Sequence, residues 1–320
     1  MTSDKASLPA RVAAAAVQSL RASIRTIWFL LGIVIPVTLV VALLEWSGLL
    51  RALAGLVSPL MRLVGLPGEA ALVIISSLFL SIYSAIAVAA SLALDLREAT
   101  ILAFMCLTAH NLIVESAVMR KTGSSAIKMF VLRLFLAIAS AFVLNLVLPA
   151  SLSARSFSAT ASATRLAFPD MLAAWGLSTG SLALKIGIIV LVIMMIQGFL
   201  EEFGALKWLS RLFAPAMRIF GLPASLSFLW IVINLVGYPY GAGIIVKEID
   251  EGRMKPQDGD LLNHHAGACH SLLEYTTLYV VLGIPILWIT IPRILLAIIV
   301  VWAERGRRRY FRRSFRAGIA

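Results

Sequence analysis

Apolar runs of about 20 residues recur along almost the whole length of this 320-residue chain. The runs cover residues 27–44, 70–94, 99–119, 126–149, 182–200, 224–246 and 282–303. Each run is long enough to cross, or to fold back within, a hydrocarbon core of about 30 Å. Hydrophobic residues make up 60% of the chain and charged residues only 14%. The sequence therefore predicts an all-α polytopic membrane protein without a sizeable soluble domain.

An internal duplication organises these runs. The segment EWSGLLRALAGLVSPLMRLVGLP at 45–67 is matched by EEFGALKWLSRLFAPAMRIFGLP at 201–223. The Pro, Arg and Gly-Leu-Pro positions coincide at one constant spacing, which chance would not reproduce. The chain is thus predicted to comprise two homologous halves, a Ser/Ala-rich linker and a basic tail. Their ranges are 1–150 and 165–304 for the halves, 151–164 for the linker and 305–320 for the tail.

Each half repeats the same order of parts. An apolar span is followed by an amphipathic segment expected at the membrane interface, an interrupted apolar stretch, a helix with a polar stripe and a last span. These ranges are 27–44, 48–64, 70–94, 99–119 and 126–149, then 182–200, 204–220, 224–246, 261–281 and 284–303. A further basic, Ala-rich helix at 8–26 is expected to lie at the interface ahead of the first span.

The interrupted stretches have two interpretations. The second contains GYPYGAG at 237–243, which cannot continue as a regular helix, and the first contains the milder SIYS at 81–84. Each stretch is either one kinked span or a re-entrant hairpin of two half-helices. Hairpins fit the Lys and Arg distribution better, because they put most basic residues on one side together with both termini. In that arrangement each half has three spans and the halves are inverted.

The net charge of +12 comes largely from the tail, RGRRRYFRRSFR at 305–316. Such a tail is typical of a cytoplasmic anchor that contacts anionic lipid headgroups. Nucleic-acid binding would need a folded reading module, and the sequence contains none. The two cysteines, Cys106 and Cys269, both lie in apolar segments and imply no disulfide framework.

A polar stripe interrupts the apolar character of the segment NHHAGACHSLLEYTT at 263–277. On one helical face it would present Asn263, Gly267, His270, Glu274 and Thr277. A weaker copy in the first half comprises Thr108, Asn111 and Glu115. Spacings slightly larger than the first one align Asn111 with His270, Glu115 with Glu274, Gly123 with Gly283 and Arg133 with Arg293. Ionisable groups at bilayer depth persist where they face a bundle interior or a wet cavity. We hypothesise that the two stripes are the halves of one transport site.

The helices TAHNLIVESAVMRKTG (108–123) and ACHSLLEYTTLYVVLG (268–283), with the duplicated Gly-Leu-Pro segment, resemble the nucleoside-recognition or Gate domain membrane proteins. That family is related to the spore maturation membrane proteins and shares its domain with ferrous-iron and concentrative nucleoside transporters. The resemblance implies a bacterial inner-membrane protein with two inverted Gate-type repeats, and it does not settle a substrate. The cysteine motif of the iron-transporter Gate is not evident, and no GxxxxGK[ST] loop is present.

The acidic residues Glu115 and Glu274 are candidates to carry a proton or to neutralise a cation. His270 lies one turn from Glu274, so the two can pair and form a proton relay. Asn111 takes the equivalent place in the first half and offers a neutral donor and acceptor. The alternative is that these residues only form buried hydrogen bonds that hold helices together.

Two further sets of residues are candidates. Tyr83, Tyr238 and Tyr240 lie near the proposed hairpin tips, where they either contact a nucleoside-like solute or simply pack the tip, and Asn234 can bridge the broken backbone. For a metal ion the candidate ligands are His270, Glu274 and Cys269, although no HExxH or CxxC pattern is present.

The sequence therefore predicts a secondary transporter or permease that moves a small polar solute, nucleoside-like, or an ion by alternating access at the repeat interface. The alternatives are a divalent metal-ion permease and a non-transporting membrane scaffold. No nucleophile–base constellation predicts an enzyme, and no cofactor is expected. The expected partners are the solute and the lipid bilayer, with a homo-oligomer left open and with both termini cytoplasmic.

Overall fold

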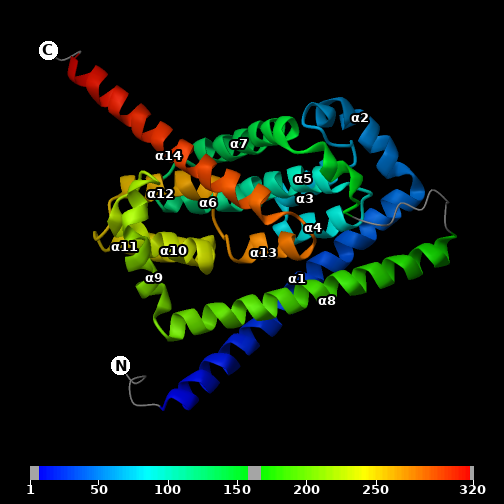
Figure 1. Ribbon diagram of the computed structural model, residues 1–320, viewed down its shortest axis with the longest axis horizontal. Coiled ribbons are helices and arrows are strands. Elements are labelled where there is room, and N and C mark those ends of the chain that lie inside the picture. Colours follow the sequence, from blue (N-terminus) through cyan, green and yellow to red (C-terminus); the bar gives the residue numbers. More distant parts are fainter. Residues whose placement is uncertain (1–6, 158–166, 318–320) are drawn as a thin grey trace.

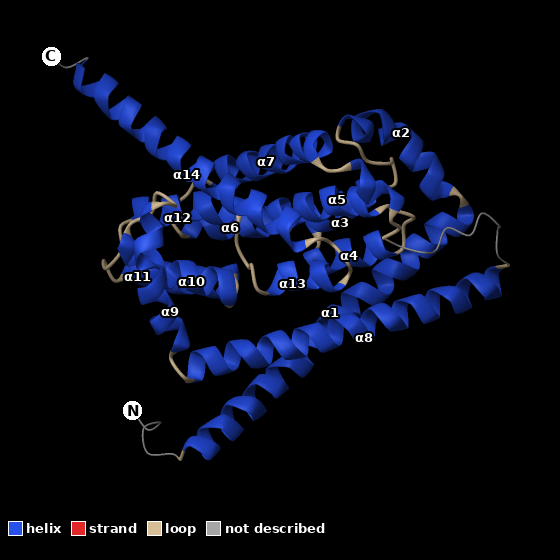
Figure 2. Ribbon diagram, in the orientation of Figure 1, coloured by secondary structure: helices blue, strands red, loops and turns tan. Residues whose placement is uncertain are grey.

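The computed structural model describes residues 7–157 and 167–317, in which helices are joined by short loops (Figure 2). The first half contains α1 (Leu8–Ser47), α2 (Leu49–Leu63), α3 (Ala70–Phe79), α4 (Ile82–Ala90), α5 (Leu96–Ala109), α6 (Leu112–Lys121) and α7 (Ala126–Val147). The second contains α8 (Phe168–Glu202), α9 (Ala205–Phe213), α10 (Ser227–Leu235), α11 (Tyr238–Asp250), α12 (Pro256–Ala268), α13 (Glu274–Val281) and α14 (Ile286–Ala317). Short 3₁₀ helices lie at Ala150–Ala154, Ala214–Arg218 and Ala224–Leu226.

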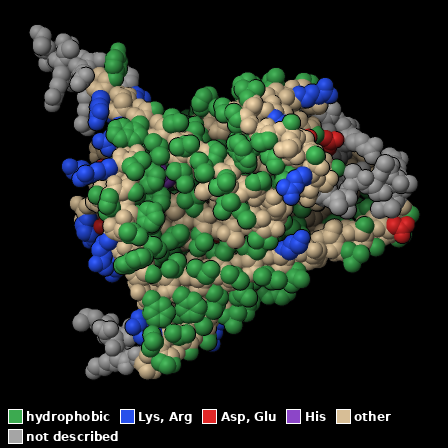
Figure 3. Space-filling model, viewed as in Figure 1, with side chains coloured by type: hydrophobic (Ala, Val, Ile, Leu, Met, Phe, Trp, Pro, Cys, Tyr) green, Lys and Arg blue, Asp and Glu red, His purple; other side chains and the backbone are tan. Residues whose placement is uncertain are grey.

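The protein is an all-α, multi-pass membrane protein. In the described residues, five helical segments are long and apolar enough to cross a bilayer. They are Leu8–Leu44, Leu96–Lys121, Ala126–Val147, Phe168–Glu202 and Ile286–Tyr310. Figure 3 shows hydrophobic side chains covering the middle of the visible face, while Lys and Arg gather toward its edges. This surface suits contact with lipid and confirms the predicted fold class.

Each half begins with a long helix, and α1 packs along α8 (Figure 1). Their contact includes a hydrogen bond from Trp175 Nε1 to Thr38 Oγ1 at 3.2 Å. The separate interfacial helix predicted at 8–26 is not found, because α1 continues through it into the first span. No glycine, and no proline beyond the first helical turn, occurs in that Ala-rich stretch, so nothing in it ends the helix.

The two interrupted stretches form helical hairpins, α3 with α4 and α10 with α11. Ser81 has extended backbone and caps α4, its Oγ accepting from the Ser84 N–H at 3.1 Å. Gly237 has φ 125°, a conformation that only glycine adopts without strain, and it turns the chain between α10 and α11. Gly241 then faces Ile233 of the preceding helix, so the two half-helices lie against each other.

The two polar helices, predicted to be continuous over 99–119 and 261–281, are both broken. The first is divided into α5 and α6, and the second into α12 and α13. The predicted stripe therefore does not lie on one helical face. Its first member, Asn263, donates to Thr122 Oγ1 at 2.8 Å and so fixes the connection between α6 and α7. Gly267 also lies on α12, whereas His270, Glu274 and Thr277 lie at or beyond the break.

Candidate functional site

Two matched histidines mark the two helix breaks. His110 follows α5 and His270 follows α12, and the Nδ1 of each contacts the backbone carbonyl four residues earlier, at 2.9 and 2.6 Å respectively. The next residue in each half has left-handed backbone, with φ 45° at Asn111 and 49° at Ser271. A helix cannot continue through that conformation, so each break has the same local cause.

The backbone at each break is held by the hairpin of its own half. The Asn111 N–H donates to Ser77 O on α3 at 2.8 Å, and the Ser271 N–H donates to Ile233 O on α10 at 2.9 Å. A free backbone N–H away from water would cost about 1–3 kcal/mol. The hairpins therefore make the breaks tolerable and set their position.

The histidines meet at the centre of the molecule together with one carboxylate and one arginine. His110 Nε2 and His270 Nε2 are 3.2 Å apart. Glu115 Oε1 lies 3.2 Å from His110 Nε2, and its Oε2 lies 3.6 Å from His270 Nε2. Arg133 Nη2 contacts Glu115 Oε2 at 2.8 Å. All four side chains are buried, so the carboxylate has its countercharge inside the protein.

Arg133 and Arg293 occupy equivalent positions in the two halves, but within the described part of the chain only Arg133 pairs with a carboxylate. Arg133 donates to His110 O, and Arg293 donates to His270 O, each at 2.8 Å. Arg293 makes no ion pair with an acidic side chain among the described residues, and its Nε and Nη1 lack hydrogen-bond partners there. Glu274, the acidic residue of that half, instead accepts from the Tyr83 hydroxyl of α4. The two halves are thus alike in backbone and different in charge pairing.

Tyrosine rings line the histidine pair. The Tyr275 ring lies edge-on to His110, with centroids 4.8 Å apart, and Tyr238 lies 5.5 Å from His270. The Tyr238 hydroxyl donates to Asn263 Oδ1 at 2.9 Å. Glu274 and Tyr275 are only partly buried, whereas both histidines are buried.

The remaining predicted residues lie in different places. Asn234 is buried, and its carbonyl accepts from the Leu273 N–H at 3.1 Å, which bridges the second break. Tyr240 is exposed, and its hydroxyl donates to Glu201 at 3.0 Å, away from the histidines. The Asn111 side chain makes no hydrogen bond within the described residues, so its contribution there is the backbone turn.

The predicted metal ligands are not brought together as a set. In the described residues His270 shares a group of converging ligand atoms with His110 and Glu115, and neither Cys269 nor Glu274 belongs to that group. A second group comprises Asp260, His264 and Glu304 at the end of the molecule where α14 leaves it.

Sequence reasoning missed the equivalence of the histidines. The sequence alignment matches Asn111 with His270, whereas the structure pairs His110 with His270 and Asn111 with Ser271 through their matching backbone. The spacing that matches Gly123 with Gly283 and Arg133 with Arg293 contains this register, and extending it back to the histidines would have found the pair.

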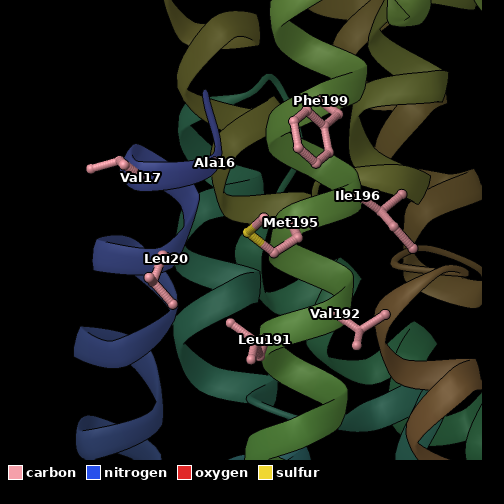
Figure 4. Close-up of a pocket in the computed structure, with 8 residues that line it drawn as sticks. All are labelled: Ala16, Val17, Leu20, Leu191, Val192, Met195, Ile196 and Phe199. Carbon is pink, nitrogen blue, oxygen red and sulfur yellow. The ribbon is translucent and has the colours of Figure 1, made fainter. Parts of the chain in front are cut away.

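A groove between α1 and α8 is of a different kind. Its lining side chains, which include Leu20, Met195 and Phe199, are all apolar (Figure 4). Because it offers no hydrogen-bonding side chain, it cannot select a polar solute. The buried polar cluster is therefore the candidate functional site.

Comparison with known proteins gives two matches. Residues 27–147 match the family model Gate, described as nucleoside recognition. The chain is 32% identical over 286 residues to the uncharacterized membrane protein YvoD of Bacillus subtilis, with 89% of this chain and 92% of that protein covered. No solved structure matches.

Proposed function

Because the chain belongs to the Gate, or nucleoside-recognition, family of membrane proteins, we propose that it is a secondary transporter for a small polar solute or an ion. The substrate site lies between the break of α5 and α6 and the break of α12 and α13. The observation that carries the proposal is the contact of His110 with His270 at 3.2 Å, which joins the two breaks across the halves. Transport proceeds by alternating access at this interface.

Membrane energetics support this interpretation. Interrupted helices at bilayer depth are tolerated only where protein buries them or where they line a wet cavity. Charged side chains there cost about 2.5–3.5 kcal/mol each on insertion scales, so a structural hydrogen bond alone is a weak reason to keep several of them. Discontinuous helices at the interface of two repeats are the recurring plan of secondary transporter sites.

The unequal charge pairing of the halves supports two states. Here Glu115 pairs with Arg133, while Glu274 bonds to Tyr83 and leaves Arg293 without a carboxylate. In the state open to the other side, we expect Glu274 to pair with Arg293 and Glu115 to be released. The two carboxylates then carry or neutralise the charge that moves with the solute, while Tyr83 and Tyr238 shape the path.

The test uses the full chain in proteoliposomes. Uptake of labelled nucleosides and divalent cations is measured with and without an imposed proton gradient, for the wild type and for Glu115→Gln and Glu274→Gln. We expect both variants to lower uptake by about tenfold or more, the change that about 1.4 kcal/mol of lost binding produces. Glu201→Gln is the matched control, because Glu201 bonds to Tyr240 away from the cluster.

Two outcomes would contradict the proposal. One is a folded wild type that moves none of these solutes under either condition, which would favour a non-transporting scaffold. The other is uptake at the wild-type rate by both glutamine variants, which would leave the cluster with a purely structural role.

A further inference from the structure

We propose that His110, His270 and Glu115 bind a divalent transition-metal ion through two imidazole nitrogens and one carboxylate oxygen. If the protein is a transporter, as proposed above, the bound ion, of the Zn²⁺ or Fe²⁺ class, is its transported substrate. Only this identification of the substrate rests on the proposed function. The ligand set differs from the one that the sequence suggested, since it joins the two halves of the chain.

The hydrogen bonds of the two histidines leave the Nε2 atom of each neutral ring free to bind a metal ion. Each Nδ1 faces a backbone carbonyl oxygen, which can only accept, so each Nδ1 bears the hydrogen of the neutral ring. The Nε2 atoms of the two neutral rings are then both lone pairs, and they face each other at 3.2 Å. Two facing lone pairs repel unless a proton or a metal cation lies between them, and the Glu115 carboxylate beside both nitrogens attracts either one.

The distances match what a tetrahedral ion needs. Ligand atoms at about 2.0–2.1 Å from a tetrahedral Zn²⁺ lie about 3.3 Å from one another. The two histidine nitrogens are 3.2 Å apart, and the Glu115 oxygens lie 3.2 and 3.6 Å from them. The two distances to Glu115 come from different oxygens, so two edges of a coordination tetrahedron are in place. One atom from each of the three side chains lies within 4.8 Å of the others, so an adjustment of the side chains brings them to the third edge.

The groups behind these ligands are those that metal sites employ. Ligating histidines commonly donate their other ring N–H to a backbone carbonyl, which fixes the ring, and ligating carboxylates are themselves hydrogen-bonded. Both histidines have that carbonyl. Arg133 Nη2 holds Glu115 Oε2 at 2.8 Å, which leaves Oε1 directed toward His110.

The fourth ligand position is left to water or to a released ligand. Catalytic zinc sites keep such an open position, whereas structural sites close it with a fourth side chain. Here Glu274 and Tyr275, which lie beside the buried cluster, are only partly buried. Three protein ligands leave a fourth position for water, which suits an ion that must enter and leave.

The other group of converging ligands is already occupied by protein cations. Glu304 contacts Lys128 Nζ at 2.9 Å and Arg308 Nε at 2.8 Å, and Arg308 also pairs with Asp260. Both carboxylate oxygens of Glu304 contact these cations, whereas at Glu115 only Oε2 contacts an arginine, so His264 in this group is the matched control for His270.

The experiment titrates metal-free full-length protein in detergent with Co²⁺, whose visible absorption reports tetrahedral coordination, and then displaces it with Zn²⁺. We expect one equivalent of Co²⁺ to bind to the wild type and to His264→Gln. Since even residues behind the ligands change metal affinity by about 10–100-fold, we expect His110→Gln and His270→Gln to weaken binding by about 100-fold or more. X-ray absorption of the Zn²⁺-loaded wild type should show imidazole nitrogen and oxygen ligands and no sulfur.

Several results would overturn the metal site. They are a wild type that binds neither ion, binding that survives both histidine substitutions in folded protein, loss of binding in His264→Gln, and a sulfur ligand in the absorption spectrum. The last measurement uses only the wild type and stays decisive if a variant fails to fold. Nucleoside uptake without metal binding would contradict only the metal site. Metal binding without uptake of any solute would contradict the transport proposal.

Discussion

At the residue scale, the two matched arginines differ in whether a buried carboxylate depends on them, so their contributions to stability should differ. Arg133 and Arg293 are both fully buried and both donate to the carbonyl of a histidine. Only Arg133 has a carboxylate partner, at 2.8 Å. Removing one partner of a buried ion pair is costly because the other charge is left unpaired in a medium that solvates it poorly.

We therefore expect Arg133→Gln to destabilise the protein by about 3–5 kcal/mol, the usual cost of leaving a buried charge unpaired. Arg293→Gln leaves no carboxylate unpaired in this state, so it should lower the free energy of unfolding clearly less. Thermal unfolding of the two variants in the same detergent tests the comparison. Equal destabilisation by the two substitutions would mean that Glu115 does not depend on Arg133.

The sequence alone predicts which types of residue form much of the site. Glu115, His270, Glu274 and Tyr83 were all selected from the sequence, and the structure brings them to the cluster or its edge. The sequence pattern does not select His110, because on a continuous helix it would point about 100° away from Asn111. The left-handed turn at Asn111 removes that constraint, and it depends on a partner on α3 that no local pattern reveals.

At the element scale, a helix break can be predicted from the sequence only when its cause is local. The break between α10 and α11 has a local cause, glycine and proline in GYPYGAG, and the sequence predicted it. The breaks in the polar helices occur at ordinary residues, and their backbone N–H groups are satisfied by the tips of the hairpins. Such a break is a tertiary effect, since the same residues would propagate a helix elsewhere.

The hairpin of α10 and α11 allows a matched glycine test. A Cβ on Gly241 would collide with the buried, β-branched Ile233, whereas a Cβ on Gly243 would meet nothing within 4 Å. We expect Gly241→Ala to cost about 1–3 kcal/mol through overpacking. Gly243→Ala should be neutral or stabilise by about 0.5–1 kcal/mol, the usual gain in a helix. If both variants melt alike, α10 and α11 are not packed as described.

At the scale of the whole molecule, charge and topology point the same way. The start of α1 and the end of α14 lie on the left of Figure 1, together with the connection between α6 and α7 and the connection between α11 and α12. These connections touch, because Ser124 Oγ donates to Asp260 at 2.5 Å, and Lys128 pairs with Glu304 of α14. In Figure 3 more Lys and Arg side chains are visible on that side than on the opposite side, as expected if that side faces the cytoplasm.

This arrangement makes a membrane-topology prediction that separates hairpins from kinked spans. If α3 with α4 and α10 with α11 turn back inside the bilayer, the chain after Gly123, after Gly252 and at the C-terminus lies in the cytoplasm. The stretch after Ala154 then lies outside. Fusions truncated at these points in a bacterial host should give green fluorescent protein signal at the first three positions and alkaline phosphatase activity only after Ala154.

Kinked spans would move the loop at Gly123 to the outside while leaving Gly252 inside, because the chain would cross the membrane once more before α5. Phosphatase activity at Gly123 would therefore contradict the hairpins and, with them, the inverted relation of the halves. In the proposed inverted arrangement, His110 and His270 would approach the same point from opposite faces of the membrane. Alternating access needs such a shared point, since each half must be able to take the conformation of the other.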